Sequence, residues 1–387
     1  MRRIYLDNSA TAPPFPKAVA AAAEVSAGPF GNPSSLHRMG MEAEAVLEEA
    51  RRVVADGLRA DPSEVIFTSG GTESNNLALF GVAANRRHPH VVVSAVEHSS
   101  VLEAARRLAE RGVAVDVAPV DADGQVRLDA LRELVRPNTS IVSVMRVNNE
   151  VGTVQPIREI ARILDDVAAR YGRRPVLHTD AVQAFCRVDV DPKAQGVDLV
   201  TVSAHKIGGP KGIGALYVRR GIRLVPLLVG GDQEGGLRAG TQNVPGAAGF
   251  GAALRIWQQS GPTMLDHLQR LRDVLREALN TIPGLAWNTP AQAERTAPHI
   301  LNFSVPGLRG ETLVHRLAAE GVYVSTGSAC HSRKPRPSHV LLAMGRSEQE
   351  AMSSIRVSLG PQNTEAEVLA AARAIRAAVE DLSAVRL

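Results

Sequence analysis

The sequence predicts an α/β fold in which a doubly wound, mostly parallel sheet is followed by a smaller α+β domain. The chain has 387 residues, of which 44% are hydrophobic, so it can bury one large core and a companion domain. Short β-branched runs alternate with amphipathic segments between residues 65 and 218, as in doubly wound sheets. From about residue 260 this alternation gives way to a long polar helix and separate strands.

The first part of the chain contains seven strand candidates and four main helix candidates. The strands are expected at Val65–Phe67, Val91–Val93, Val113–Val117, Ile141–Val147, Val176–His178, Val197–Val202 and Ala215–Val218. The helices are expected at Glu42–Leu58, Glu73–Arg86, Ser99–Arg111 and Ile157–Arg170. The first and third helices carry Glu/Arg pairs at helical spacing, which indicates solvated faces.

The last part of the chain predicts a second unit. Its elements are expected at Met264–Asn280 (helix), Ile300–Val305 (strand), Thr312–Glu320 (helix), Val322–Val324 (strand), Ile355–Leu359 (strand) and Glu365–Leu382 (helix). We therefore expect residues 16–259 to form a large α/β domain, and residues 1–15 and 260–387 to form the small domain that carries Cys330.

Composition excludes several classes of protein. The best apolar stretch, Ala18–Val25, is short and interrupted by Glu24, so no membrane segment is expected. Asp7 comes before any secretory apolar region, which predicts a cytoplasmic protein without a signal peptide. Two cysteines are too few for a disulfide framework and fit a reducing compartment. The net charge of +4 is interspersed and aromatic residues are only 3%, so direct nucleic-acid binding is not expected.

A glycine-containing turn, Thr68–Glu73, follows one predicted strand and opens a predicted helix. Free backbone N–H groups at such a turn can hold an anionic group, which predicts a phosphate site. The alternative is an ordinary β–α turn. The turn lacks the lysine of a Walker loop, and one Gly-Gly pair is not a dinucleotide fingerprint.

A lysine follows the strand at Val197–Val202, next to the glycine-rich stretch 208–212. Lys206 could form a Schiff base if burial lowers its pKa, although most lysines at strand ends are solvated cations. Ser203 and His205 are suitable phosphate donors. Asp180 ends another strand and could pair with a pyridinium nitrogen, where a helix cap is the alternative.

His98 comes just after a fourth strand and could stack on a ring and move protons. A capping or surface histidine is the alternative. Because ligands of open α/β sheets bind at the carboxyl ends of strands, these four strand ends predict one shared site.

A set of short motifs, in order along nearly the whole chain, resembles cysteine desulfurases, the pyridoxal 5′-phosphate (PLP) enzymes of aminotransferase class V. The matching segments are residues 5–11, 31–35, 68–75, 97–98, 148–152, 180–183, 203–206, 326–330 and 354–356. The resemblance implies PLP fold type I, like that of aspartate aminotransferase, and a homodimer with two active sites near the subunit interface. It implies PLP as the cofactor and no metal.

The resemblance also implies roles for single residues. The residues expected around the cofactor are Lys206 as its covalent anchor, Asp180 at the pyridine nitrogen, Gln183 at the phenolic oxygen, His98 as the ring-stacking acid/base, Asn149 beside it, and Gly71, Thr72, Ser203 and His205 at the phosphate. Thr241 matches a threonine that the neighbouring subunit lends to the phosphate. Asn32 and Asn149 match residues beside the substrate, and Arg356 matches the clamp on the substrate carboxylate, where a surface ion pair is the alternative.

Cys330 is the expected nucleophile. It lies in a polar stretch of small residues, and the cations Arg333, Lys334 and Arg336 that follow favour a thiolate. Free cysteines are more often inert core residues, which is the role expected for Cys186. The same basic cluster could dock an acidic sulfur acceptor, with a solvated loop as the alternative.

The implied reaction converts L-cysteine to L-alanine. Lys206 removes the α-proton, Cys330 attacks the substrate sulfur and becomes a persulfide, and His98 takes part in proton transfer. An acceptor protein, either a scaffold or a sulfur carrier, is expected to take the sulfur, for example for iron–sulfur cluster assembly. Two alternatives stay open: a selenocysteine lyase, which His331 also fits, and a class V aminotransferase that does not use Cys330.

Besides the stretch with His331, the chain departs from the family pattern in the loop 230–237 and at Cys186-Arg187. Asp232 stands where a third glycine is usual and Gly235 where an arginine is usual, which weakens the Thr241 assignment. Cys186-Arg187 stands where Gly-Lys is common.

Overall fold

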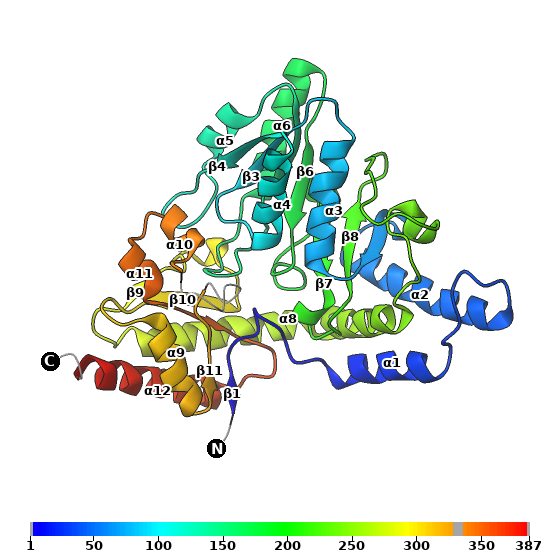
Figure 1. The fold of residues 1–387 in the computed structure, drawn as a ribbon. Coiled ribbons are helices and arrows are strands. Elements are labelled where there is room, and N and C mark those ends of the chain that lie inside the picture. The colour runs from blue at the N-terminus through cyan, green and yellow to red at the C-terminus, as the bar shows by residue number, and fades with distance from the viewer. Residues whose placement is uncertain (1–2, 328–335, 385–387) are drawn as a thin grey trace.

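A seven-stranded sheet forms the centre of the protein in the computed structural model, which describes residues 3–327 and 336–384 (Figure 1). The strand order is β2-β8-β7-β6-β5-β3-β4. The strands are β2 (Val65–Thr68), β3 (His90–Ser94), β4 (Ala114–Ala118), β5 (Thr139–Ser143), β6 (Val176–Asp180), β7 (Leu199–Ser203) and β8 (Gly214–Val218). Only β8 runs antiparallel to its neighbours, β2 and β7. The expected mostly parallel sheet is therefore confirmed.

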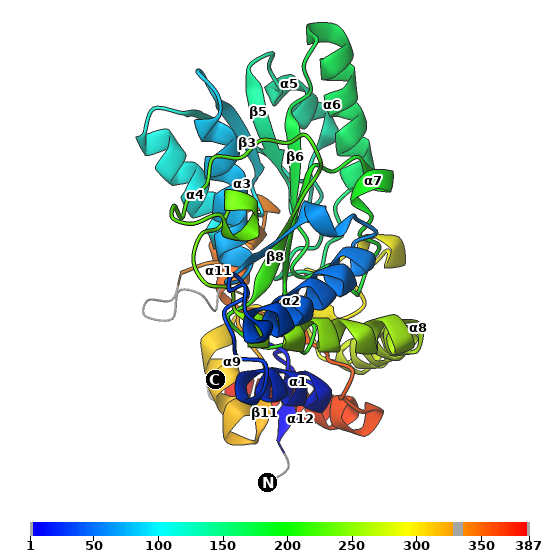
Figure 2. The same ribbon diagram turned by 90° about the vertical axis from the view of Figure 1, so that its right-hand side faces the viewer.

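Helices cover both faces of this sheet (Figures 1 and 2). They are α3 (Gly71–Ala84), α4 (Ser99–Glu110), α5 (Leu128–Leu134), α6 (Ile157–Tyr171) and α7 (Pro192–Gln195). Alternate residues of β3 face opposite sides: Val91 and Val93 share a core with α3 and α4, whereas Val92 belongs to the core with α6. Burial on both faces explains why the central strands read as continuous β-branched runs.

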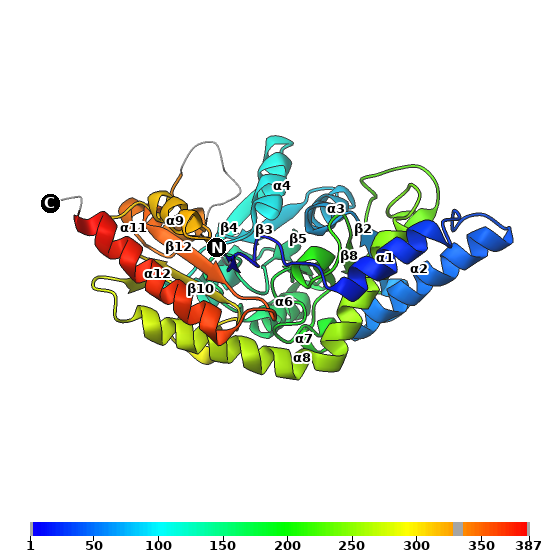
Figure 3. The same cartoon turned by 90° about the horizontal axis from the view of Figure 1, so that it is seen from below.

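The longest helix, α8 (Val244–Leu279), crosses the whole molecule (Figure 3). It packs on α1 (Pro16–Ala27) and α2 (Arg38–Gly57) at one end and on α12 (Glu365–Ala384) at the other. The expected helix began only at Met264. Its first half is rich in glycine and alanine, with weak periodicity, and packing that buries Phe250 and Trp257 makes it helical. The expected boundary at residue 259/260 falls inside this helix, and the division into two domains stays a prediction.

The remaining strands form two small sheets. Strand β10 (Ile300–Ser304) lies between β9 (Ala286–Trp287) and β12 (Ser354–Ser358), with antiparallel pairing on both sides. Strand β1 (Ile4–Tyr5) pairs in parallel with β11 (Val322–Tyr323), which ties the start of the chain to a late segment. The other helices are α9 (Gly310–Ala319), α10 (His339–Ala343), α11 (Glu348–Met352) and the 3-10 turns η1 (Pro62–Glu64), η2 (Ala204–Lys206), η3 (Gln233–Gly236) and η4 (Ala293–Arg295).

The expected strands agree with the observed ones to within one or two residues, with one exception. The run Ile141–Val147 was expected to be one strand, but β5 ends at Ser143. Beyond Ser143 the chain makes only isolated backbone hydrogen bonds to β6. The N–H of Val144 donates to the carbonyl of His178, and the N–H of Arg146 donates to the carbonyl of Asp180. Within residues 3–327 and 336–384, no helix has both the length and the apolar character needed to span a bilayer.

Candidate active site

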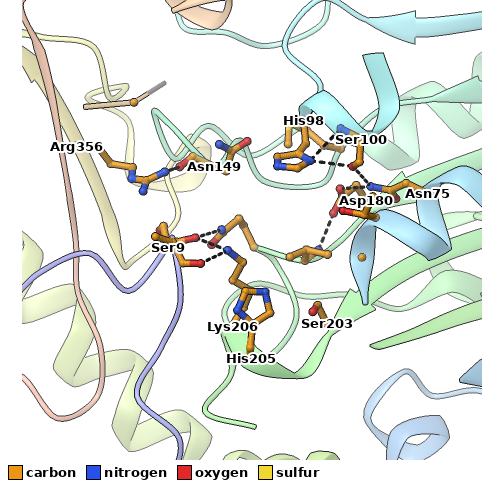
Figure 4. Close-up of a pocket in the computed structure, with 17 residues that line it drawn as sticks. Ser9, Asn75, His98, Ser100, Asn149, Asp180, Ser203, His205, Lys206 and Arg356 are labelled. Carbon is orange, nitrogen blue, oxygen red and sulfur yellow. Dashed lines mark hydrogen bonds between the residues drawn. The ribbon is translucent and has the colours of Figure 1, made fainter. Parts of the chain in front are cut away.

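A cavity of about 360 Å³ lies at the carboxyl ends of β2, β6 and β7. Its walls include residues from the N-terminal segment, the central sheet and β12 (Figure 4). The lining residues are Ser9, Ala10, Gly71, Thr72, Asn75, His98, Ser100, Met145, Asn149, Asp180, Val182, Gln183, Ser203, His205, Lys206, Gly327 and Arg356. This volume suits a small organic ligand.

The N-terminus of α3 forms one end of the cavity. Gly70 precedes the helix with φ +151°, a conformation that favours glycine. A side chain at Gly71 would bring its Cβ to 2.8 Å from Cγ2 of Val182, so only glycine fits without a shift. Gly71 and Thr72 line the cavity at the first turn, where helical N–H groups lack intrahelical partners. Together with the helix dipole, this end of the cavity suits an anion.

Lys206 lies in η2, directly after β7. Its Nζ donates to the carbonyl oxygens of Ser9, at 2.6 Å, and Ala10, at 2.7 Å. Its neighbour His205 has Nδ1 3.1 Å from Oγ1 of Thr11. Burial, with the cations Lys206 and Lys211 nearby, lowers the pKa of His205 to about 4, so its ring is neutral at pH 7.

Asp180, at the end of β6, is joined to His98 through two side chains (Figure 4). Nδ2 of Asn75 donates to Oδ2 of Asp180 at 2.7 Å and to Oγ of Ser100 at 2.8 Å. Oγ of Ser100 lies 2.8 Å from Nδ1 of His98. The second oxygen of Asp180 accepts from the backbone N–H of Val182 at 2.9 Å. The carboxylate is thus fixed from two sides.

Gln183 is held in one orientation. Its Nε2 donates to the carbonyl of Ser9 at 2.9 Å, and its Oε1 lies 3.3 Å from Nε2 of His299. Burial, with the cations Arg187 and Arg356, lowers the pKa of His299 well below its ordinary value. A neutral His299 can donate to Gln183 through Nε2–H, which leaves the amide nitrogen of Gln183 on the Ser9 side.

Arg356 approaches the cavity from β12. Its Nη2 donates to Oδ1 of Asp7 at 2.8 Å, and its Nη1 donates to the carbonyl of Asn149 at 3.0 Å. Its Nε is buried without a hydrogen-bond partner among the described residues. A guanidinium has five N–H donors, so part of its capacity is left for an anionic ligand.

The structure brings most of the expected site residues to this one cavity. Those that line it are Gly71, Thr72, His98, Asn149, Asp180, Gln183, Ser203, His205, Lys206 and Arg356. Asn32 and Thr241 are exposed and are not among its lining residues. Cys330 and the cations Arg333 and Lys334 lie outside the described residues.

The segments that flank Cys330 reach the site. Gly327, three residues before it in the sequence, lines the cavity. Arg336 and His339 line an adjoining cavity of about 270 Å³, to which His98 and Gly327 also contribute.

Several contributors were not singled out from the sequence. Asn75 and Ser100 connect Asp180 to His98, and the carbonyls of Ser9 and Ala10 hold Lys206. Helical spacing offers a signal only for Asn75, which lies one turn after Gly71 in α3. Backbone carbonyls carry no signal in the residue type.

The aminotransferase class-V family profile matches residues 4–370. This chain belongs to the class V aminotransferases. It is 40% identical over 366 residues to cysteine desulfurase IscS 1 of Archaeoglobus fulgidus, covering 94% of each chain. It resembles the structure of a NifS-like protein with a TM-score of 0.90, at 38% identity, over 99% of this chain and 100% of the other. The structure of SspA in complex with cysteine matches with a TM-score of 0.79, at 33% identity, over 94% and 100%.

These matches confirm the expected family, its cysteine desulfurase relatives and PLP fold type I. Membership of this class V aminotransferase family implies dependence on PLP.

The backbone conformation is informative at two of the departures from the family pattern. Cys186 has φ +66°, a backbone conformation that suits the glycine common at this position in the family. Burial raises the pKa of the Cys186 thiol to about 12, which keeps it protonated. The next residue, Arg187, donates from Nη2 to the carbonyl of Lys206. Gly235 has φ +64°, which favours glycine over arginine.

Proposed function

We propose that this chain is a cysteine desulfurase that transfers the sulfur of L-cysteine to Cys330 as a persulfide and releases L-alanine. The observation that carries the proposal is the meeting of Lys206, Asp180 and Arg356 at one cavity, in a chain 40% identical to a cysteine desulfurase. An amine, a carboxylate and a guanidinium are the groups needed to hold PLP and an amino acid.

The chemistry of the donors around the cavity fits PLP. The phosphate would be held by the N-terminus of α3 at Gly71 and Thr72 with Ser203 and His205, the pyridine nitrogen by Asp180, the phenolic oxygen by Gln183, and the aldehyde carbon by Lys206. Two cavity residues also carry buried atoms without partners among the described residues, Oγ of Ser9 and Oδ1 of Asn75. Such atoms are usually satisfied by a ligand or water.

Two residues of the chain bind the substrate and remove its α-proton. When bound, PLP supplies an electron sink for the charge that loss of the substrate α-proton creates. Arg356 binds the substrate carboxylate, with its orientation fixed by Asp7 and Asn149. Lys206 takes the α-proton on Nζ, and the carbonyls of Ser9 and Ala10 hold that amine in place.

The sulfur step uses Cys330. Its thiolate attacks the substrate sulfur, so that an S–S bond forms while the C–S bond breaks. The electron pair of the C–S bond stays with the substrate carbon, which is then protonated to give the methyl group of alanine. The product on the enzyme is the Cys330 persulfide, whose outer sulfur passes to an acceptor protein, which leaves Cys330 as a thiolate.

The proposed enzyme is a homodimer. Thr241 is exposed, as expected if it completes the phosphate site of the neighbouring subunit. Large apolar side chains are also exposed on the segment between α1 and α2, where Phe30 is exposed by 67% and Leu36 by 97%, and on the segment between β8 and α8, where Val229 is exposed by 82%. Burial of these side chains against a second subunit would remove them from water.

Two variants test the function. Cys330→Ala is expected to bind PLP but to lose sulfur release from L-cysteine. Lys206→Ala is expected to lose the covalently held cofactor, which is measured by the visible absorption of PLP. Cys186→Gly is the matched control, because it removes the other thiol and suits the backbone there, and it should keep activity. Aminotransferase turnover that survives in Cys330→Ala would contradict the proposal. So would selenide release from selenocysteine that survives in Cys330→Ala, together with little activity of the unsubstituted protein on L-cysteine.

A further inference from the structure

A chain of hydrogen bonds runs along one side of the cavity and joins three elements. It starts at Asp180 at the end of β6, passes through Asn75 of α3 and Ser100 of α4, and ends at Nδ1 of His98 (Figure 4). Asn75, Ser100 and Asp180 are buried. His98 is the N-cap of α4, and its ring accepts from the backbone N–H of Ser100 at 3.1 Å.

The direction of each hydrogen bond follows from what each group can do. The backbone N–H of Ser100 can only donate, so Nδ1 of His98 must be an acceptor and carry no proton. A carboxylate only accepts, so the nitrogen of the Asn75 amide must face Asp180. The second hydrogen of that nitrogen goes to Oγ of Ser100, which leaves the hydroxyl hydrogen of Ser100 for Nδ1 of His98.

We propose that Ser100 and Asn75 are positioning residues that hold His98 as the neutral tautomer with its proton on Nε2, so that His98 is a hydrogen-bond donor to the cavity and not a base. A neutral imidazole carries one proton on its two nitrogens. Because Nδ1 accepts hydrogen bonds from the hydroxyl and the backbone N–H of Ser100, that proton is on Nε2. To accept a second proton, His98 would have to break both contacts. The acid/base role expected for His98 therefore becomes a binding role, and Lys206 moves the protons.

The charges around His98 agree with a neutral ring. Burial lowers its pKa, and Lys206 and His339 lower it further, against the opposing effects of Asp180 and Glu150. Each of these groups belongs to a different segment: Asp180 to β6, Lys206 to η2, His339 to α10 and Glu150 to the loop after β5.

The test reads the ring nitrogens directly. PLP-loaded protein labelled with ¹⁵N-histidine is titrated between about pH 4 and pH 8, and the His98 signals are assigned by their loss in His98→Asn. In the unsubstituted protein we expect Nδ1 to resonate as an unprotonated nitrogen and Nε2 as a protonated one above about pH 6. In Ser100→Ala we expect some Nδ1-protonated form and a midpoint of protonation higher by about one pH unit.

Two further variants complete the test. Ser99→Ala makes the same chemical change one residue earlier in α4 and should leave the His98 shifts unchanged, and Ser100→Thr, which keeps the hydroxyl, should restore them. A protonated Nδ1 in the unsubstituted protein would overturn the proposal, and so would a Ser100→Ala protein with unchanged shifts and midpoint. The assignment of the His98 tautomer does not depend on the proposed function, whereas the role of His98 in the reaction rests on it. Since the shifts need no turnover, a protein that does not release sulfur but shows the expected shifts would contradict the function and leave the tautomer assignment standing.

Discussion

At the scale of the residue, burial rather than residue type decides the protonation of the groups near the site. His205 and His299 are both kept neutral by desolvation. Burial shifts the pKa of Glu97, next to His98, in the opposite direction, and raises the pKa of its carboxyl to about 8. Its Oε1 accepts from Oγ of Ser94 and from the backbone N–H of Met145, both at 2.6 Å, whereas Oε2 is buried without a partner among the described residues.

The raised pKa of Glu97 predicts that the free energy of unfolding falls as the pH rises. Its carboxyl has a pKa of about 8 in the folded protein against an ordinary value of 4.5, so between these values the folded state binds more protons than the unfolded state. The free energy of unfolding should therefore decrease between about pH 5 and pH 8, by up to about 1.4 kcal/mol per pH unit from this group. Glu97→Gln cannot ionise and should lose this slope.

Thermal unfolding at several pH values, at constant cofactor saturation, measures this difference. Glu103→Gln changes an exposed glutamate of the same region and serves as the control. Parallel stability curves for Glu97→Gln and the unsubstituted protein would show that Glu97 is ionised in the fold.

The residues that the sequence could predict are those whose chemical type is unusual for their position. Lys206 follows β7 and Asp180 ends β6, and the ends of parallel strands meet at one edge of a sheet. Asn75 and Ser100 lie within helices in which polar side chains are common, and only the packing of α3 beside α4 shows that they connect. The contacts of Lys206 with Ser9 and Ala10 bridge 197 and 196 positions and involve backbone oxygens, which no pattern marks.

At the scale of the element, the buried ion pair between Arg51 and Glu234 connects α2 and β2 to η3. Nη1 and Nη2 of Arg51 donate to the two carboxylate oxygens of Glu234, at 2.7 and 2.8 Å. Glu234 also accepts from the backbone N–H of Phe67, and Arg51 donates to the carbonyl of Val65. Glu234 adopts φ +50°, so these contacts hold it in an unfavourable conformation.

Removal of Glu234 should be costly, because Nη1 and Nη2 of the buried Arg51 lose their contacts with a carboxylate and only its Nε stays paired, with Glu48. Glu234→Ala is expected to lower the free energy of unfolding by about 3–5 kcal/mol. The double variant Arg51→Met, Glu234→Met should lose less than Glu234→Ala, because no charge stays buried. Arg52→Ala breaks the exposed pair with Glu49 on the same helix and should cost under about 1 kcal/mol.

Urea unfolding measures all three variants. Equal losses for Glu234→Ala and Arg52→Ala would mean that the Arg51–Glu234 pair adds no more stability than a surface contact.

Elements with a clear period could be predicted from the sequence, and those that depend on packing could not. The central strands were found because both of their faces are buried. The first half of α8 was missed because its many small residues give little periodicity, and its contacts with α1 and α2 make it helical. The pairing of β1 with β11 was missed because each strand has only two residues.

At the scale of the whole molecule, the site depends on segments that are distant in sequence. Pairing of β1 with β11, together with the hydrogen bond of Asn8 to the carbonyl of Ser358, brings the N-terminal segment against Lys206 and Gln183. Since residues from both ends of the chain form the cavity, its geometry depends on the fold as a whole.

The proposed dimer predicts an effect of charge at the exposed apolar segments. The protein should sediment as a dimer, and Leu36→Glu should shift it towards monomer with a loss of PLP affinity, because Thr241 would then be missing from the partner's site. Tyr171→Glu, at an exposed position at the end of α6, is the control and should stay dimeric. A monomer at micromolar concentration, or a Leu36→Glu protein that stays fully dimeric, would contradict the dimer and its interface.

The most direct test of the function is mass spectrometry of the peptide that contains Cys330 after PLP-loaded protein has reacted with L-cysteine. We expect the mass of one additional sulfur atom on Cys330, lost on treatment with a thiol reductant, and no such addition on Cys186. Formation of alanine from L-cysteine by a protein whose Cys330 never carries the extra sulfur would contradict the persulfide mechanism.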